Sequence, residues 1–360
     1  MKENGFGSAA KKRLATLKPG ERIDPEFALD IARSAPVHEL GEAALRQRRA
    51  RHGDRAYYVY NQHLNYTNIC RNQCRFCAYS KRIGEEGGYT YSLAQMRTLL
   101  QDRMEHPIRE IHIVGGLNPD LPYEYYLDML ALCKELRPDA VVKAFTAVEV
   151  AYFADTCDRD EATVLREMRA AGLDVLPGGG AEVFAPAMRA QLCPEKISAD
   201  RWLHIHGLAH DMGMKTNCTM LFGHIESWED RIHHLDRLRT LEDARPGFVC
   251  FIPLAYQPHN NALGVPGPTG EEYLRMISVS RLFLDNIPHI KAYWAFSGIK
   301  AAQMALWAGA DDFDGTIVEE KIGHAAGADS PKGMTIADLV ETIAATGFTP
   351  VQRDTFFQEL

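Results

Sequence analysis

Residues 57–79, "YYVYNQHLNYTNICRNQCRFCAY", place a β-rich run directly before a loop with three cysteines. Cys70, Cys74 and Cys77 lie within eight residues in the spacing CxxxCxxC, whereas the other five cysteines are single and far apart. The loop is otherwise mostly polar, which suits a backbone that wraps an inorganic group. The spacing favours a cubane 4Fe-4S cluster with three irons bound by cysteine and one iron open to a small molecule.

Other uses of a cysteine trio fit less well. A structural zinc site needs four ligands, and His63 is the nearby candidate for the fourth. A ferredoxin-type cluster also needs four cysteines, and a disulfide would leave one thiol over. An iron–sulfur electron carrier or sensor, which would normally require a fourth protein ligand, stays as a non-enzymatic alternative.

The rest of the chain alternates short apolar runs with helical patterns. The runs are residues 57–66, 110–116, 141–147, 173–179, 215–223, 247–255, 290–296 and 312–318. Helical patterns lie between them at residues 92–104, 123–136, 161–172, 197–213, 227–242, 270–286 and 297–310. Eight such alternations predict an α/β fold, a TIM-type (β/α)8 barrel, with an open doubly wound sheet as the alternative.

Further helices are predicted outside the barrel, at residues 25–34, 40–52 and 335–347. We therefore expect three parts: an N-terminal helical extension, the barrel, and a C-terminal helix and tail packed on the barrel, at residues 1–55, 56–330 and 331–360. Because TIM barrels carry their chemistry at the C-terminal ends of the strands, the residues just past each run are expected to form one active-site mouth.

Composition excludes several classes of function. A net charge of −8, from 40 basic and 48 acidic residues, argues against a general nucleic-acid or membrane-surface binder. The first twenty residues hold no apolar run of signal-peptide length, and no later segment is apolar enough to span a membrane. We expect a cytoplasmic protein with neither a nucleic-acid nor a membrane partner.

The cysteine loop resembles the CxxxCxΦC signature of radical S-adenosylmethionine (SAM) enzymes, in which Φ is an aromatic residue, here Phe76. The resemblance implies a 4Fe-4S cluster bound by the three cysteines, SAM on the open iron, and a one-electron donor such as flavodoxin or ferredoxin. Gly115 and Gly116 in "IVGG" resemble the family's glycine motif, which contacts the methionine amino group of SAM. Leu117 replaces the usual acidic residue of that motif, so only backbone contacts carry over.

Longer stretches, among them "LPGGGAEVFAPAMRAQLCPEKIS" and "VEEKIGHAAGA", resemble the menaquinone-pathway group of radical SAM enzymes, and within it the aminofutalosine synthases. That resemblance implies addition of the 5′-deoxyadenosyl radical to the enol ether of 3-[(1-carboxyvinyl)oxy]benzoate, with SAM consumed as a substrate. Aryl migration and loss of the carboxyl group as bicarbonate then give aminodeoxyfutalosine and methionine. The alternatives are dehypoxanthine futalosine cyclase and the deazaflavin-forming synthases.

Several further residues are candidates for binding. Glu149 and Glu182 each follow a strand and suit the ribose hydroxyls or the ammonium group of SAM, although either carboxylate could instead cap a helix. The substrate carries two carboxylates, for which the candidate partners are His224, His259, Lys143, His112 and Arg281, with His224 and Arg281 given a catalytic role. His206 and His210 lie four apart on a predicted exterior helix and are interpreted as helix-surface residues.

Overall fold

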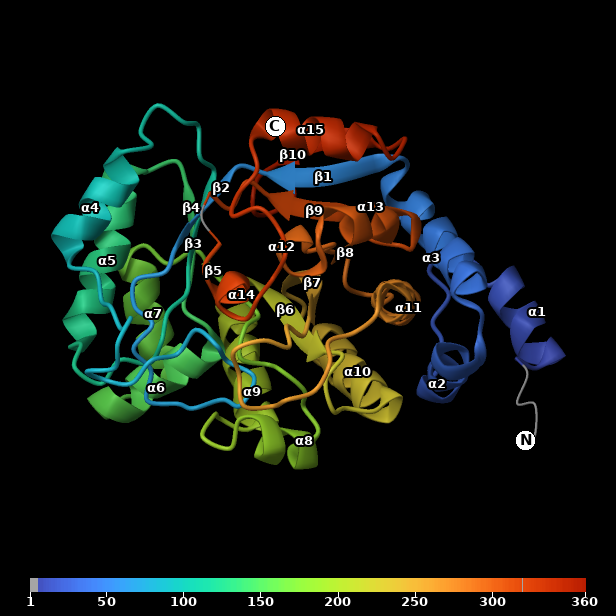
Figure 1. The fold of residues 1–360 in the computed structure, drawn as a ribbon, viewed down its shortest axis with the longest axis horizontal. Helices are drawn as coiled ribbons and strands as arrows, with labels where there is room; N and C mark the ends of the chain where they lie inside the picture. Colours follow the sequence, from blue (N-terminus) through green and yellow to red (C-terminus); the bar gives the residue numbers. More distant parts are fainter. Residues whose placement is uncertain (1–5, 319) are drawn as a thin grey trace.

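The computed structural model of the chain describes residues 6–318 and 320–360. Residues 1–5 of the predicted N-terminal extension, and position 319 in the predicted barrel, lie outside the described residues. The main sheet is parallel, with the strand order β2-β3-β4-β5-β6-β7-β8, and it curls around a central space (Figure 1). Its strands are β2 (Asn61–Leu64), β3 (Glu110–Ile113), β4 (Val141–Ala144), β5 (Val175–Leu176), β6 (Lys215–Phe222), β7 (Phe248–Ala255) and β8 (His289–Ile290).

A second parallel sheet continues the curl, in the order β10-β1-β9, formed by β10 (Thr349–Arg353), β1 (Arg55–Val59) and β9 (Asp312–Gly315). The two sheets are joined by backbone hydrogen bonds at both ends: Ala292 N–H donates to the carbonyl of Asp312 at 2.7 Å, and His63 N–H donates to that of Ile317 at 2.9 Å. The predicted α/β, TIM-type barrel is thus confirmed.

One detail of the strand prediction is wrong, and one strand was missed. The run at residues 57–66 is not one strand, because the chain breaks at Tyr60 and passes from the second sheet (β1) to the main sheet (β2). The run at residues 312–318 forms β9, which pairs with β1 as the closing strand of a barrel should. β10 was not predicted; it is an edge strand containing Pro350, and edge strands tolerate proline because one side needs no partner.

The seven helices predicted between the strands are confirmed with small changes in their ends. They are α4 (Leu93–Gln101), α5 (Tyr123–Leu136), α7 (Glu161–Ala171), α9 (Ala199–Asp211), α10 (Trp228–Ala244), α11 (Gly270–Phe283) and α13 (Ile299–Trp307). Ser92 and Ser227 begin α4 and α10 with capping boxes, in which side chain and backbone satisfy each other's free polar groups. Further helices inserted along the barrel are α6 (Ala147–Cys157), α8 (Pro186–Leu192), α12 (Trp294–Ser297) and α14 (Ile322–Ala325).

Terminal elements cover one side and one edge of the barrel. The N-terminal helices are α1 (Ser8–Thr16), α2 (Pro25–Ser34) and α3 (Val37–His52); α2 packs on α10 and α11, and α3 packs on α11. The C-terminal helix α15 (Ile336–Ala344) lies beside the second sheet, which puts the C-terminal segment next to β1 (Figure 1). In the described part of the chain, no helix has both the length and the apolar character needed to cross a membrane.

The prediction for His206 and His210 is wrong, because both side chains are buried on the inner face of α9. The ring of His206 stacks on Trp202 with centroids 3.8 Å apart. His210 bonds the carbonyl oxygen of Arg245 and the hydroxyl of Thr216, both at 2.7 Å. Two histidines four residues apart on this helix are therefore core residues that fix α9 to the barrel.

Candidate active site

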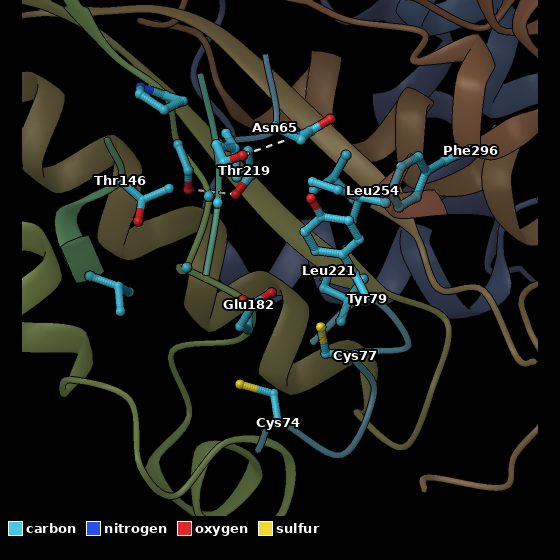
Figure 2. Close-up of a pocket in the computed structure, with 18 of the residues that line it drawn as sticks. Asn65, Cys74, Cys77, Tyr79, Thr146, Glu182, Thr219, Leu221, Leu254 and Phe296 are labelled. Atoms are coloured by element: carbon cyan, nitrogen blue, oxygen red, sulfur yellow. Dashed lines mark hydrogen bonds between the residues drawn. The ribbon is translucent and has the colours of Figure 1, made fainter. Parts of the chain in front are cut away.

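A cavity of about 310 Å³ lies inside the barrel and opens at the C-terminal ends of the strands. Its lining includes most of the residues predicted for the site: Cys70, Cys74, Phe76, Cys77, Gly115, Gly116, Glu149 and Glu182. Figure 2 shows Cys74 and Cys77 in the lower part of the view, below Glu182, with Leu221, Leu254 and Phe296 above them. Residues from segments far apart in the sequence therefore meet in one space, as the barrel prediction required.

The three cysteine thiols suit a cluster that leaves one iron open. Of the cysteines in the described residues, only Cys70, Cys74 and Cys77 line the cavity, and all three are free. The thiol of Cys70 accepts the backbone N–H of Leu117 at 3.4 Å, a donor of the kind that stabilises a thiolate. Burial raises the pKa of Cys74 to about 12, so its thiolate forms when a metal displaces the proton. The residues present thus fit the group that the motif implies.

Backbone hydrogen bonds hold the cysteine loop in place. Cys70 N–H donates to the carbonyl of Lys81, Arg71 N–H to that of Leu117, and Arg75 N–H to that of Leu192, each at 2.9 Å. These contacts come from three different parts of the barrel mouth. Neighbouring segments of the protein therefore hold the loop in place.

The glycine pair at the end of β3 allows the cysteine loop to pack closely. A Cβ on Gly116 would lie inside contact distance of the carbonyl oxygen of Ile69, 2.7 Å from the carbonyl carbon and 2.9 Å from Cys70 Cβ. A Cβ on Gly115 would lie 2.5 Å from the ring of Tyr66. Both glycines are therefore required for close packing. This steric role comes in addition to the contact with SAM that the motif implies.

Glu149 belongs to the N-terminus of α6 and also faces the cavity. Thr146 and Glu149 form a capping box, and Glu149 accepts the Thr146 N–H at 2.7 Å and the Tyr66 hydroxyl at 3.0 Å. Burial raises the pKa of Glu149 to about 7, against the effect of these hydrogen bonds. The helix cap and the cavity lining, considered as alternatives from the sequence, are both present.

Glu182 is paired with Lys196, a residue that the sequence analysis did not single out. The two side chains form an ion pair, and the Lys196 ammonium lies over the ring of Phe76 at 5.2 Å. Glu182 has φ = 48°, an unusual left-handed conformation for a residue that is not glycine, and its carbonyl accepts the Leu221 N–H at 3.0 Å. Backbone strain of this kind is often found where a side chain is held for function.

Both residues given a catalytic role from the sequence lie outside the cavity lining. His224 is bound to the carboxylate of Glu226 at 2.8 Å and sits behind Tyr256, with ring centroids 6.0 Å apart. Arg281 is buried on α11, where it donates to the carbonyl of Gly309 at 2.8 Å and pairs with Asp311. Each side chain has structural partners and neither lines the cavity, so the position of His224 and Arg281 does not support the catalytic role predicted for them.

The other residues predicted to bind the substrate carboxylates lie in two different places. His259 is exposed on the loop after β7 and lies outside the cavity lining, whereas His112 and Lys143 line the cavity inside the barrel. Asn217 and Thr219 on β6 line it as well and were missed, because polar residues inside a strand give no signal of their own. The polar lining thus extends from the mouth into the barrel interior.

Comparison with known proteins agrees with this fold and site. Residues 64–238 match the radical SAM superfamily, and residues 245–359 match the CofH/MqnC C-terminal region. The matched stretch includes the three cysteines, the glycine pair and both carboxylates. The chain belongs to the radical SAM superfamily, whose members use a 4Fe-4S cluster and SAM.

Comparison with individual enzymes gives more specific similarities within this superfamily. The chain is 41% identical to aminodeoxyfutalosine synthase of Thermus thermophilus, over 95% of this chain and 93% of that protein. It is 38% identical to aminodeoxyfutalosine synthase of Streptomyces coelicolor, over 96% of this chain and 92% of that protein. It is 37% identical to cyclic dehypoxanthine futalosine synthase of Streptomyces coelicolor, over 95% of this chain and 86% of that protein.

Solved structures share the fold at low sequence identity. Methylornithine synthase matches with a TM-score of 0.75 and 17% identity, over 95% of this chain and 97% of that one. The FeFe-hydrogenase maturase HydG from Carboxydothermus hydrogenoformans matches with a TM-score of 0.74 and 14% identity, over 97% of this chain and 80% of that one. At these identities the likeness establishes the barrel architecture alone.

Proposed function

We propose that the protein is an aminodeoxyfutalosine synthase of menaquinone biosynthesis, a radical SAM transferase that forms a C–C bond. The 5′-deoxyadenosyl group of SAM is joined to the enol-ether methylene of 3-[(1-carboxyvinyl)oxy]benzoate. The aryl group then migrates and the carboxyl group leaves as bicarbonate, which gives aminodeoxyfutalosine and methionine. The observation that carries the proposal is that three free thiols share one cavity with a polar mouth and a partly apolar interior.

Different residues of this chain have different roles in the proposed reaction. Cys70, Cys74 and Cys77 would hold the cluster, which supplies, when bound, the single electron that splits the sulfonium of SAM. Glu149 and the Glu182–Lys196 pair offer the charged and hydrogen-bonding groups that the ribose and the amino-acid end of SAM require. SAM is consumed in the reaction, so these contacts must release methionine after each turnover.

The proposed reaction also requires a cavity that encloses the radical and the alkene. A radical and an alkene react efficiently only when held in near-attack geometry, and a hydrogen donor at the wrong place would quench the radical. Leu221, Leu254 and Phe296 give one side of the cavity an apolar surface. An aromatic substrate buries its ring there and displaces water from the space next to the cysteines.

The test is an anaerobic reaction of cluster-reconstituted protein with SAM, dithionite and the enol-ether benzoate. The expected product carries the adenosine moiety covalently, and free 5′-deoxyadenosine stays a minor product. Formation of stoichiometric 5′-deoxyadenosine from SAM, with no adduct, would contradict the proposal.

The same experiment separates the alternatives. The cyclase reaction begins with hydrogen abstraction and therefore releases 5′-deoxyadenosine, and it requires dehypoxanthine futalosine as the added substrate. Transfer of a tyrosine-derived hydroxyphenyl group, the activity named for the Methanopyrus kandleri relative that is 38% identical, requires tyrosine. Incubation with each substrate in turn assigns the reaction. An electron carrier would cleave SAM with none of them.

A further inference from the structure

Three titratable side chains form one row across the first strands of the main sheet. The strand register pairs His63 of β2 with His112 of β3, and His112 with Lys143 of β4. Residues that are partners in register point to the same face of a parallel sheet, and all three line the cavity. His112 and Lys143 each lie three residues before the mouth residues Gly115 and Thr146, which places the row about 10 Å deeper in the barrel.

This row is unusual for its position. Barrel interiors of this type are filled mainly by layers of bulky apolar side chains. Here the rings of His63 and His112 lie with centroids 4.8 Å apart beside open space. Nδ1 of His112 is buried without a hydrogen-bond partner in the described structure. A buried polar atom left unpaired costs free energy, and a ligand group can recover that cost.

Lys143 contributes donors to the same row. Its ammonium group pairs with Glu110 at 2.5 Å, which uses one of its three N–H bonds. Burial lowers the pKa of Lys143 and the Glu110 charge opposes this, while burial also lowers the pKa of His63 and His112. Both imidazoles are therefore neutral at pH 7, and each has an N–H to donate.

Lys291 lies near the row, because its charge acts on the pKa of both Lys143 and His112. Lys291 is paired with Asp314 and lies 3.5 Å from Asp312, so two carboxylates hold it, whereas a single carboxylate, that of Glu110, pairs with Lys143. Asn217 on β6 also lines the cavity, and its amide oxygen is buried without a hydrogen-bond partner. The free donors therefore gather on one side, along β2, β3 and β4.

We propose that His63, His112 and Lys143 form the subsite for the carboxylate on the aromatic ring of the substrate. The inference rests on the proposed function, in which the alkene must face the cysteine end of the cavity. The ring carboxylate is attached to the far side of the aromatic ring and so points into the barrel, toward the row. The ring itself lies along Leu221 and Leu254.

The test measures binding of two probes, 3-hydroxybenzoate and 3-hydroxybenzamide, to cluster-reconstituted protein in the presence of SAM. The amide keeps the ring and its shape but removes the charge. We expect the wild type to prefer the benzoate. His112→Phe should weaken binding of the benzoate about tenfold to a hundredfold, the range for a lost hydrogen bond to a charged group, and that of the benzamide less, by about twofold to tenfold, the range for a neutral group. His112→Asn, which keeps a donor, should recover part of the loss.

A matched control and a second variant keep the test decisive. His259→Phe makes the same replacement on the exposed loop outside the cavity and should leave both affinities unchanged. If His112→Phe does not fold, as judged by iron content and melting temperature, His63→Phe tests the same row with the same expected selectivity. Equal losses for benzoate and benzamide would mean that the row only packs, and an unchanged benzoate affinity would place the carboxylate elsewhere.

The outcome is independent of the reaction assay. If the wild type forms the adenosine adduct but its benzoate affinity does not depend on the row, the subsite is wrong and the proposed function stands. If no adduct forms while His112→Phe still abolishes the preference for benzoate over benzamide, the proposed reaction is wrong and the row remains a subsite for an aromatic carboxylate.

Discussion

Gly116→Ala is expected to displace the cysteine loop. The added methyl carbon would lie 2.7 Å from the carbonyl carbon of Ile69 and 2.9 Å from Cys70 Cβ, whereas ordinary contacts begin at 3.4 Å. The nearest atoms are backbone, which cannot rotate away, so relief requires a shift of at least about 0.7 Å in the chain next to Cys70. Overpacking of this kind costs about 1–3 kcal/mol, and a displacement approaching 1 Å in a reacting group lowers the rate on the order of a hundredfold.

The assay is the rate of dithionite-dependent SAM cleavage, with bound iron per chain and melting temperature measured on the same preparation. Gly270→Ala serves as control, because a Cβ there meets no atom within 4 Å and its φ is not in the left-handed region. We expect Gly116→Ala to lose iron and activity, with Gly270→Ala unchanged in both. Iron content and SAM cleavage within twofold of the wild type in Gly116→Ala would refute the steric argument.

Three other substitutions test separate parts of the structure. Cys74→Ser should abolish SAM cleavage and reduce bound iron, while Cys157→Ser, outside the cavity, should do neither; iron analysis after reconstitution decides between them. Burial raises the pKa of Glu149 from 4.5 to about 7, so the folded state holds a proton that the unfolded state releases, and stability falls by up to about 3 kcal/mol as pH rises between those values. Glu149→Gln should flatten this dependence in melting curves, and identical slopes in both proteins would contradict it. Arg281→Met leaves the Asp311 carboxylate buried without its cation and should cost about 3–5 kcal/mol in urea unfolding, with little change in the KM for SAM.

The sequence predicted the barrel because its strands and exposed helices alternate clearly, and it failed where the pattern carries no information. Helix α6 was missed because residues Ala147 to Ala154 are all buried, so no polar face marks a helical period. The break at Tyr60 was missed because β1 and β2 together read as one apolar run. β10 has neither alternation nor a strongly apolar composition, and only its pairing with β1 makes it a strand.

The residues of the candidate site were likewise predictable only where the sequence carries a distinct pattern. The cysteines and the glycine pair were predictable because their spacing is itself the signal. His224 follows a strand as an active-site residue should, but its ring pairs with Glu226, two residues later, and lies outside the cavity lining. Lys196 was missed because it follows α8, not a strand, and reaches the site through the ion pair with Glu182.

The pairing of β10 with β1 has a consequence for biosynthesis. Arg55 lies opposite Thr349 in the register, so β1, which leads through β2 into the cysteine loop, acquires its outer neighbour only after the distant residues 349–353 have been synthesised. Contacts this distant in sequence form late and slowly. A nascent polypeptide therefore exposes its thiols on an unfinished scaffold, which gives the cell a reason to deliver iron and sulfide after β10 has been synthesised.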